Sequence, residues 1–237
     1  VVGTPTKIDW STFTNTGLDI SAAKTALNAT SLGNVTSSVD LAIDGNVALN
    51  VLSGVLVAKG HFTIALGQLR SAALPSGAGQ DADVMTLTLT NVGVFVGVGG
   101  ALLDNNGGTA TPLDYSDDTV QNGTLGFGAT VGTLTLVSIK DRGASALLAN
   151  DDVTYLAVAL DNFAGDLVGL DALLAFHAYG VDAVLNKVAK GAAVVGTPTK
   201  IDWSTFTNTG LDISAAKTAL NATSLGAVSY THLTLPT

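Results

Sequence analysis

The amino-acid sequence predicts an all-β fold with little helix, either an antiparallel β-sandwich or an extended, curled β-sheet that a tandem repeat continues. Three observations predict it. Apolar residues alternate with small or polar ones in many short segments, clusters of Asp, Asn and Gly separate these segments, and few stretches have helical periodicity. The chain is 47% hydrophobic and 12% charged, so it has ample apolar material for a core.

The clearest strands lie in the first half of the chain. In His61–Leu66 every second residue is large and apolar, which is typical of a half-buried strand. Met85–Thr90 alternates Met or Leu with Thr in the same way. Val92–Val98 has valines on one face and Gly or Phe95 on the other, and such small residues allow another backbone to approach closely.

Turn-forming residues and glycines suggest where these strands end. We expect Asp44-Gly45-Asn46 to form a turn between strands over Val39–Ile43 and Val47–Leu56. The uncharged run Val84–Leu103 is long enough to span a bilayer. Its alternating threonines and interrupting glycines favour two consecutive strands instead, so we expect no membrane insertion.

Later strands are less sharply defined. The last clearly defined strand, Val153–Leu160, should begin after Asp151-Asp152 and end at Asp161-Asn162. Val181–Val188 also fits a helix, although we favour a strand. The clearest helix is Asp19–Asn28, with its apolar residues on one side. The other strands expected in this half are Thr124–Phe127, Thr130–Ile139 and Leu173–Tyr179.

The chain contains a perfect internal repeat. Residues Val1–Gly33 return without a substitution as Val194–Gly226, 193 residues later. This period is too long for one solenoid coil of roughly 20–50 residues and suits a whole domain copied in series. We therefore expect residues 1–193 to be one β-rich repeat, 194–226 to begin the next, and neighbouring copies of the repeat to be partners.

The end of the chain has a different character. After the second copy, Val228–Thr237 reads VSYTHLTLPT, which resembles the translated adapter used in sequencing-library preparation. The resemblance covers ten residues and implies that 227–237 is a non-native tail, so it is left out of the fold prediction.

Composition excludes several functions. The net charge of −9 argues against nucleic-acid binding, which needs clustered Lys and Arg. The chain has no cysteine, so disulfides, thiol catalysis and thiolate metal sites are excluded. An acidic chain remains compatible with divalent cations.

One acidic loop is the best candidate metal site. Residues 104–118 are rich in carboxylate and amide oxygens, which hard cations such as calcium prefer. The spacing matches neither an EF-hand nor a calcium-binding β-roll, and an ordinary solvated turn is the alternative. The candidate ligands are Asp104, Asn106, Asp114, Asp117 and Asp118.

No catalytic or cofactor-binding constellation is evident in the sequence. His61 and His177 are isolated in strand patterns, and an enzyme would need one of them to lie beside carboxylates in a cleft. The main aromatic cluster falls in the repeated segment. We interpret it as an anchor at the repeat junction, with ligand stacking as the alternative; its residues are Trp10 and Phe13 with their copies Trp203 and Phe206.

These features resemble, in composition, the repeat regions of very large bacterial surface and secreted adhesin-like proteins. The resemblance covers residues 34–193 and lies in Val/Thr/Leu/Gly strands, Asp/Asn/Gly turns, acidic charge and the absence of cysteine. It implies a non-enzymatic extracellular stalk, adhesin or fibre subunit with a possible cell-surface or glycan ligand. The alternative is a calcium- or carbohydrate-binding β module.

Overall fold

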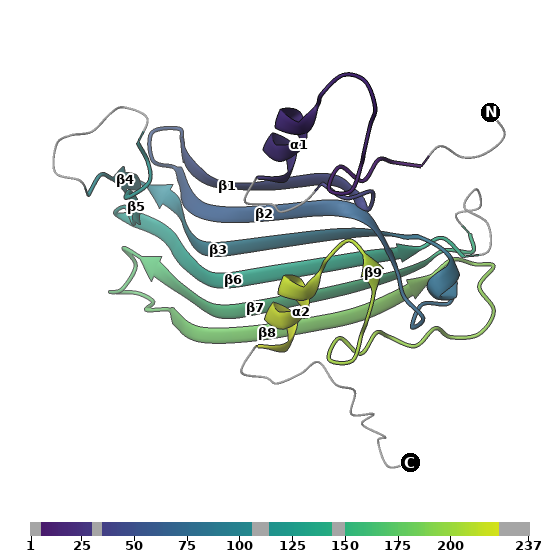
Figure 1. Ribbon diagram of the computed structural model, residues 1–237. Helices are drawn as coiled ribbons and strands as arrows, with labels where there is room; N and C mark the ends of the chain where they lie inside the picture. The colour runs from purple at the N-terminus through teal and green to yellow at the C-terminus, as the bar shows by residue number, and fades with distance from the viewer. Residues whose placement is uncertain (1–5, 30–34, 106–113, 144–149, 223–237) are drawn as a thin grey trace, which may run out of the picture.

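The computed structural model describes residues 6–29, 35–105, 114–143 and 150–222, and it contains one large antiparallel sheet (Figure 1). With 51% of residues in strands and 9% in helices, it confirms the all-β prediction. Six long strands lie side by side in the sheet in the order β1-β2-β3-β6-β7-β8, and the short strand β9 pairs with β2. These strands are β1 Val39–Val51, β2 Leu56–Arg70, β3 Ala82–Val98, β6 Leu125–Asp141, β7 Val153–Val168, β8 His177–Lys190 and β9 Thr209–Gly210.

Five further short elements complete the described part of the fold. β4 Ala101–Leu103 and β5 Thr119–Gln121 form a separate two-stranded ribbon. The helices α1 Ser21–Asn28 and α2 Ser214–Asn221 have the same sequence, SAAKTALN, because they belong to the two copies of the repeat. A single 3₁₀ turn spans Gly77–Gly79. Within the described residues, no helix is long and apolar enough to cross a membrane.

The strands are longer than the sequence indicates, and several predicted strand boundaries are wrong. β1 runs straight through Asp44–Asn46, and the chain reverses instead at Leu52 to Gly54, whose φ angles are all positive. A reversal at Asp44–Asn46 would leave the second half of β2 without its partner β1. Likewise, β3 is one strand and not two, and β7 continues through Asp161-Asn162 instead of ending there.

A row of irregular residues crosses the sheet where turns were expected. Asn91 in β3 and Asn162 in β7 have φ angles of 51° and 54°, and the pairing of β2 with β3 shifts beside Gly60. Asn tolerates this left-handed conformation, so it can form a bulge inside a strand as well as a turn. At Gly132 in β6, a Cβ would lie 3.1 Å from the Cβ of Asn162. The long strands bend together in Figure 1, as bulges allow.

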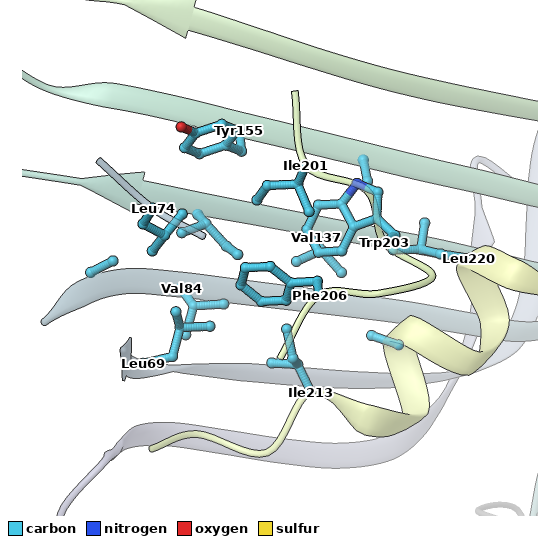
Figure 2. Close-up of a cluster of buried hydrophobic side chains, with 14 of the residues drawn as sticks. Leu69, Leu74, Val84, Val137, Tyr155, Ile201, Trp203, Phe206, Ile213 and Leu220 are labelled. Carbon is cyan, nitrogen blue, oxygen red and sulfur yellow. The ribbon is translucent and has the colours of Figure 1, made fainter. Parts of the chain in front are cut away.

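The two faces of the sheet are covered by other parts of the chain to different extents. At one end of one face, the residues after β8 cross the sheet, pair with β2 through β9 and form α2. We call residues Ile201–Asn221 the C-terminal lid. Beneath it lies the main hydrophobic cluster, which includes Leu69, Val84, Val137, Ile139 and Tyr155 (Figure 2). The opposite face has aliphatic side chains that are only half-buried, such as those of Ile64, Leu87 and Leu136.

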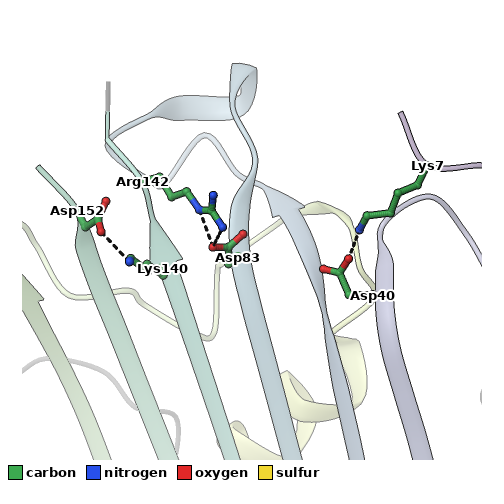
Figure 3. A network of polar contacts seen from close by, with 6 residues as sticks. All are labelled: Lys7, Asp40, Asp83, Lys140, Arg142 and Asp152. Carbon is green, nitrogen blue, oxygen red and sulfur yellow. Dashed lines mark hydrogen bonds and ion pairs between the residues drawn. The ribbon is translucent and has the colours of Figure 1, made fainter. Parts of the chain in front are cut away.

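Ion pairs join neighbouring elements at the same end of the sheet (Figure 3). Arg142 pairs with Asp83 across β6 and β3, and Lys140 Nζ lies 2.8 Å from Asp152 Oδ2. Lys7, in the first copy of the repeat, pairs with Asp40 of β1. This last pair holds the first copy near the edge strand of the sheet.

Candidate functional site

The acidic loop forms a compact group of carboxylates beside the β4–β5 ribbon. Asp104 follows β4, and Asp117 and Asp118 precede β5, so pairing of these two strands brings the three together. One carboxylate oxygen of each lies within 4.8 Å of the others. Two ligands of one calcium ion are separated by up to about 5 Å, since each Ca–O bond is about 2.4 Å. The spacing is therefore suitable for one shared cation.

Two carboxylate oxygens of this group have no hydrogen-bond partner among the residues that the structure describes. Asp118 is only 7% exposed, and its buried Oδ1 meets no hydrogen-bond partner within the described ranges. Oδ1 of Asp117 is also buried without one. Lys59 of β2 contacts this loop through the carbonyl oxygens of Ser116 and Asp118, at 2.8 and 2.5 Å. Buried anionic oxygens without partners are costly, and a bound cation would compensate them.

The other predicted ligands have different positions. Asp114 accepts hydrogen bonds from the hydroxyl and backbone N–H of Ser116, and these bonds lower its pKa. It therefore shapes the turn and lies outside the three-carboxylate group. Asn106 lies outside the described residues. Asn105, another oxygen donor of the loop, donates through its side-chain amide to the carbonyl oxygen of Asp117 at 2.8 Å and so supports the loop.

A hollow of about 620 Å³ lies between the ribbon and the sheet. Its lining is mixed and polar, with Lys59, His61 and Asp118 among its residues. The row of bulges also contributes to it through Asn91 and Asn162.

Both described histidines have carboxylate neighbours, which sequence reasoning missed. His61 Nε2 lies 3.2 Å from Asp44 Oδ2, because β1 and β2 are paired there. On its other side, His61 Nδ1 lies 3.4 Å from the hydroxyl of Thr90. His177 and Asp166 form a second pair at 2.7 Å, which is exposed. Only cross-strand register could have revealed these pairs, since the partners are 11 to 29 residues apart.

The His61 group has some features of a catalytic arrangement but lacks others. A hydroxyl nucleophile is normally within about 2.6–3.2 Å of its base, so the Thr90 contact is long. Asp44 also accepts a hydrogen bond from Thr63, which ties it into the strand surface. Asp44 thus links Thr63 to His61, and His61 in turn contacts Thr90, which makes a cross-strand polar network on the sheet.

The two copies of the repeat lie in different environments. Trp203 and Phe206 of the C-terminal lid are buried in the main cluster, at 0% and 2% exposure. Trp10 and Phe13 form the same kind of pair, with ring centroids 5.7 Å apart, but both are only half-buried. The identical residues thus form part of the core in one copy and a partly open surface in the other.

Comparisons with known proteins found no match: no family model, curated protein or solved structure resembles this chain. The interpretation of its function therefore depends on the geometry described above.

Proposed function

We propose that this chain is a non-enzymatic structural repeat of an extracellular bacterial protein, such as a stalk, adhesin or fibre subunit. The single observation that carries the proposal is the position of the repeated segment. Its second copy fills the hydrophobic cluster of the sheet with Trp203, Phe206 and Leu220, all nearly fully buried. A segment that completes one sheet and recurs after 193 residues is what a series of similar units requires.

Other features support a structural and not a catalytic role. The acidic, cysteine-free composition suits a soluble extracellular surface. The His61 group is explained by cross-strand hydrogen bonding, and the Trp10–Phe13 pair by its identity with a core pair. Neither feature requires a substrate or a glycan ligand.

The test is to express chains of one, two and three 193-residue periods and to measure their maximum dimension by small-angle X-ray scattering. A stalk unit should add a constant length per period. We expect a step of about 30 to 55 Å, between the width of six strands and the length of one 17-residue strand. A maximum dimension that stops growing as periods are added would contradict the stalk function.

The second candidate function is calcium binding, which the three-carboxylate group favours. Its ligands would be Asp104, Asp117 and Asp118, completed by loop carbonyl oxygens or water. Calcium should raise the melting temperature of the full chain, because a ligand that binds only the folded state stabilises it. Magnesium, which demands tighter octahedral geometry, should do so less.

A matched pair of substitutions makes the calcium test specific. Asp118→Asn should abolish the stabilisation by calcium, whereas Asp114→Asn should keep it, because Asp114 lies outside the group. Equal losses in the two variants would contradict this site, and so would a wild-type chain whose melting temperature is insensitive to calcium.

A further inference from the structure

The two copies of the repeated segment have the same internal fold. We call residues Ile8–Asn28 the N-terminal copy; it corresponds residue by residue to the C-terminal lid. In the N-terminal copy, Asn28 donates to the carbonyl oxygen of Trp10 at 3.2 Å, and in the lid Asn221 donates to that of Trp203 at the same distance. Lys24 contacts the carbonyl oxygen of Phe13, as Lys217 does that of Phe206.

The segment thus has the same internal fold in two different environments, in the main hydrophobic cluster and beside β1. The helix has the same length in both copies, and its side-chain amides and amines close the same turns. Docking would therefore cost little conformational ordering within the segment.

The apolar side chains of the segment are buried in the lid and exposed or half-exposed in the N-terminal copy. In the lid, α2 buries Ala216 and Leu220 against the sheet, whereas α1 buries no residue. Leu18 is 82% exposed, and its counterpart Leu211 is 6% exposed. The same apolar side of the segment is thus covered in one copy and open in the other. The buried lid residues are Ile201, Trp203, Phe206, Leu211, Ile213, Ala216 and Leu220, and their open or half-open counterparts are Ile8, Trp10, Phe13, Leu18, Ile20, Ala23 and Leu27.

The surface beneath the lid has specific polar anchors as well as apolar residues. Asn186 of β8 donates to the carbonyl oxygen of Ile201 at 2.8 Å. The hydroxyl of Ser71 donates to the carbonyl oxygen of Thr207 at 2.6 Å. On β2, the carbonyl oxygen of Gln68 accepts from the N–H of Leu211. The surface recognises the backbone of this segment at three separate points, so the fit is more than apolar contact.

We propose that the N-terminal copy docks, through its open apolar side, on the lid-binding surface of a second copy of this sheet. That surface on its own sheet is already filled by the C-terminal lid. The N-terminal copy instead lies beside the edge strand β1, where Lys7 pairs with Asp40 (Figures 1 and 3). The second copy is the occupant because the segment has the sequence and conformation that this surface binds.

This inference deepens the proposed function and rests on it, because it assigns the contact that joins successive repeats. Each shared segment would belong structurally to the sheet before it and lead into β1 of the sheet after it. Successive sheets would then be joined through a packed segment, which limits the freedom between them.

The first experiment uses a two-period chain, residues 1–193 followed by residues 1–237, with a tryptophan only in the middle copy of the segment and phenylalanine in the other two. The reference chains are the one-period W10F variant, which reports Trp203, and the W203F variant, which reports Trp10. We expect acrylamide to quench the middle tryptophan as weakly as Trp203 and severalfold less than Trp10. Quenching equal to that of Trp10 would overturn the inference.

The second experiment weakens the lid of the one-period chain by W203A/F206A and leaves Trp10 as the only tryptophan. The N-terminal copy of another molecule should then occupy the vacated surface. We expect concentration-dependent association in analytical ultracentrifugation, with Trp10 becoming protected as association proceeds. Adding W10A/F13A should abolish the association. A folded monomer at all concentrations would overturn the inference, and if the variant does not fold, the two-period chain decides alone.

The outcomes separate this inference from the proposed function. A protected middle tryptophan in a chain that does not lengthen with each period would retain the docking and reject the stalk. An exposed middle tryptophan in a chain that lengthens regularly would reject the docking and leave the stalk in place.

Discussion

Trp10 and Trp203 offer a direct test of the tertiary structure, since they are the same residue in the same local sequence. Trp203, in the lid, is fully buried against the sheet, and Trp10 is half-buried against Phe13. Replacing a buried Trp with Ala costs about 3–5 kcal/mol, through lost apolar burial and the cavity left behind. At Trp10 most of this loss is absent, because solvent already reaches the ring, and we expect about 1 kcal/mol or less.

The assay is thermal denaturation of Trp203→Ala and Trp10→Ala, monitored by far-ultraviolet circular dichroism. In a chain of this length each 1 kcal/mol lowers the melting temperature by about 2–4 °C. We therefore expect Trp203→Ala to melt roughly 10 °C below the wild-type chain and Trp10→Ala within a few degrees of it. Trp203→Phe should lie between them, since it keeps most of the apolar contact.

Equal destabilisation by the two alanine substitutions would refute the reasoning, because it would mean that both copies pack alike. A larger loss of stability for Trp10→Ala than for Trp203→Ala would contradict the reasoning even more clearly, since it would place the N-terminal copy in the core. Local propensity cannot explain any difference between the variants, because the flanking sequences are identical.

Two further predictions concern the sheet itself. Asn162→Gly should keep or slightly raise the free energy of unfolding, whereas Asn162→Val should lower it by about 1–2 kcal/mol, since a β-branched residue resists the left-handed conformation; equal effects in urea denaturation would contradict the bulge. Burial, with a smaller effect of Asp141, raises the pKa of Tyr155 to about 12. Because the pKa of Tyr155 is higher in the folded chain than in the unfolded chain, where it is about 10, its contribution to the free energy of unfolding is complete below pH 10. This contribution is lost as the pH rises toward 12. A phenolate absorbance titration should show one late step that Tyr155→Phe removes, and persistence of that step would contradict the assignment.

The sequence predicted where the candidate site lies, but it did not predict which residues form it. An acidic loop with several oxygen ligands was evident from composition. The structure selects Asp104, Asp117 and Asp118 and gives Asp114 a turn-capping role. The selection depends on pairing of β4 with β5, which brings residues 14 positions apart to one place. The pairing of His61 with Asp44 depends in the same way on strand register.

The sequence by itself determined which residues share a face within short segments such as His61–Leu66 and Met85–Thr90, because side-chain alternation is local. It also determined the repeat and the short helix within it. The tertiary structure decided where strands end, since Asp44–Asn46 and Asp161-Asn162 have turn-like residues but lie in strands whose neighbours continue. Above all, it decided that Trp203 is buried while Trp10 is not. Identical sequences encode the same local conformation, and only the sheet that one of them contacts makes their environments different.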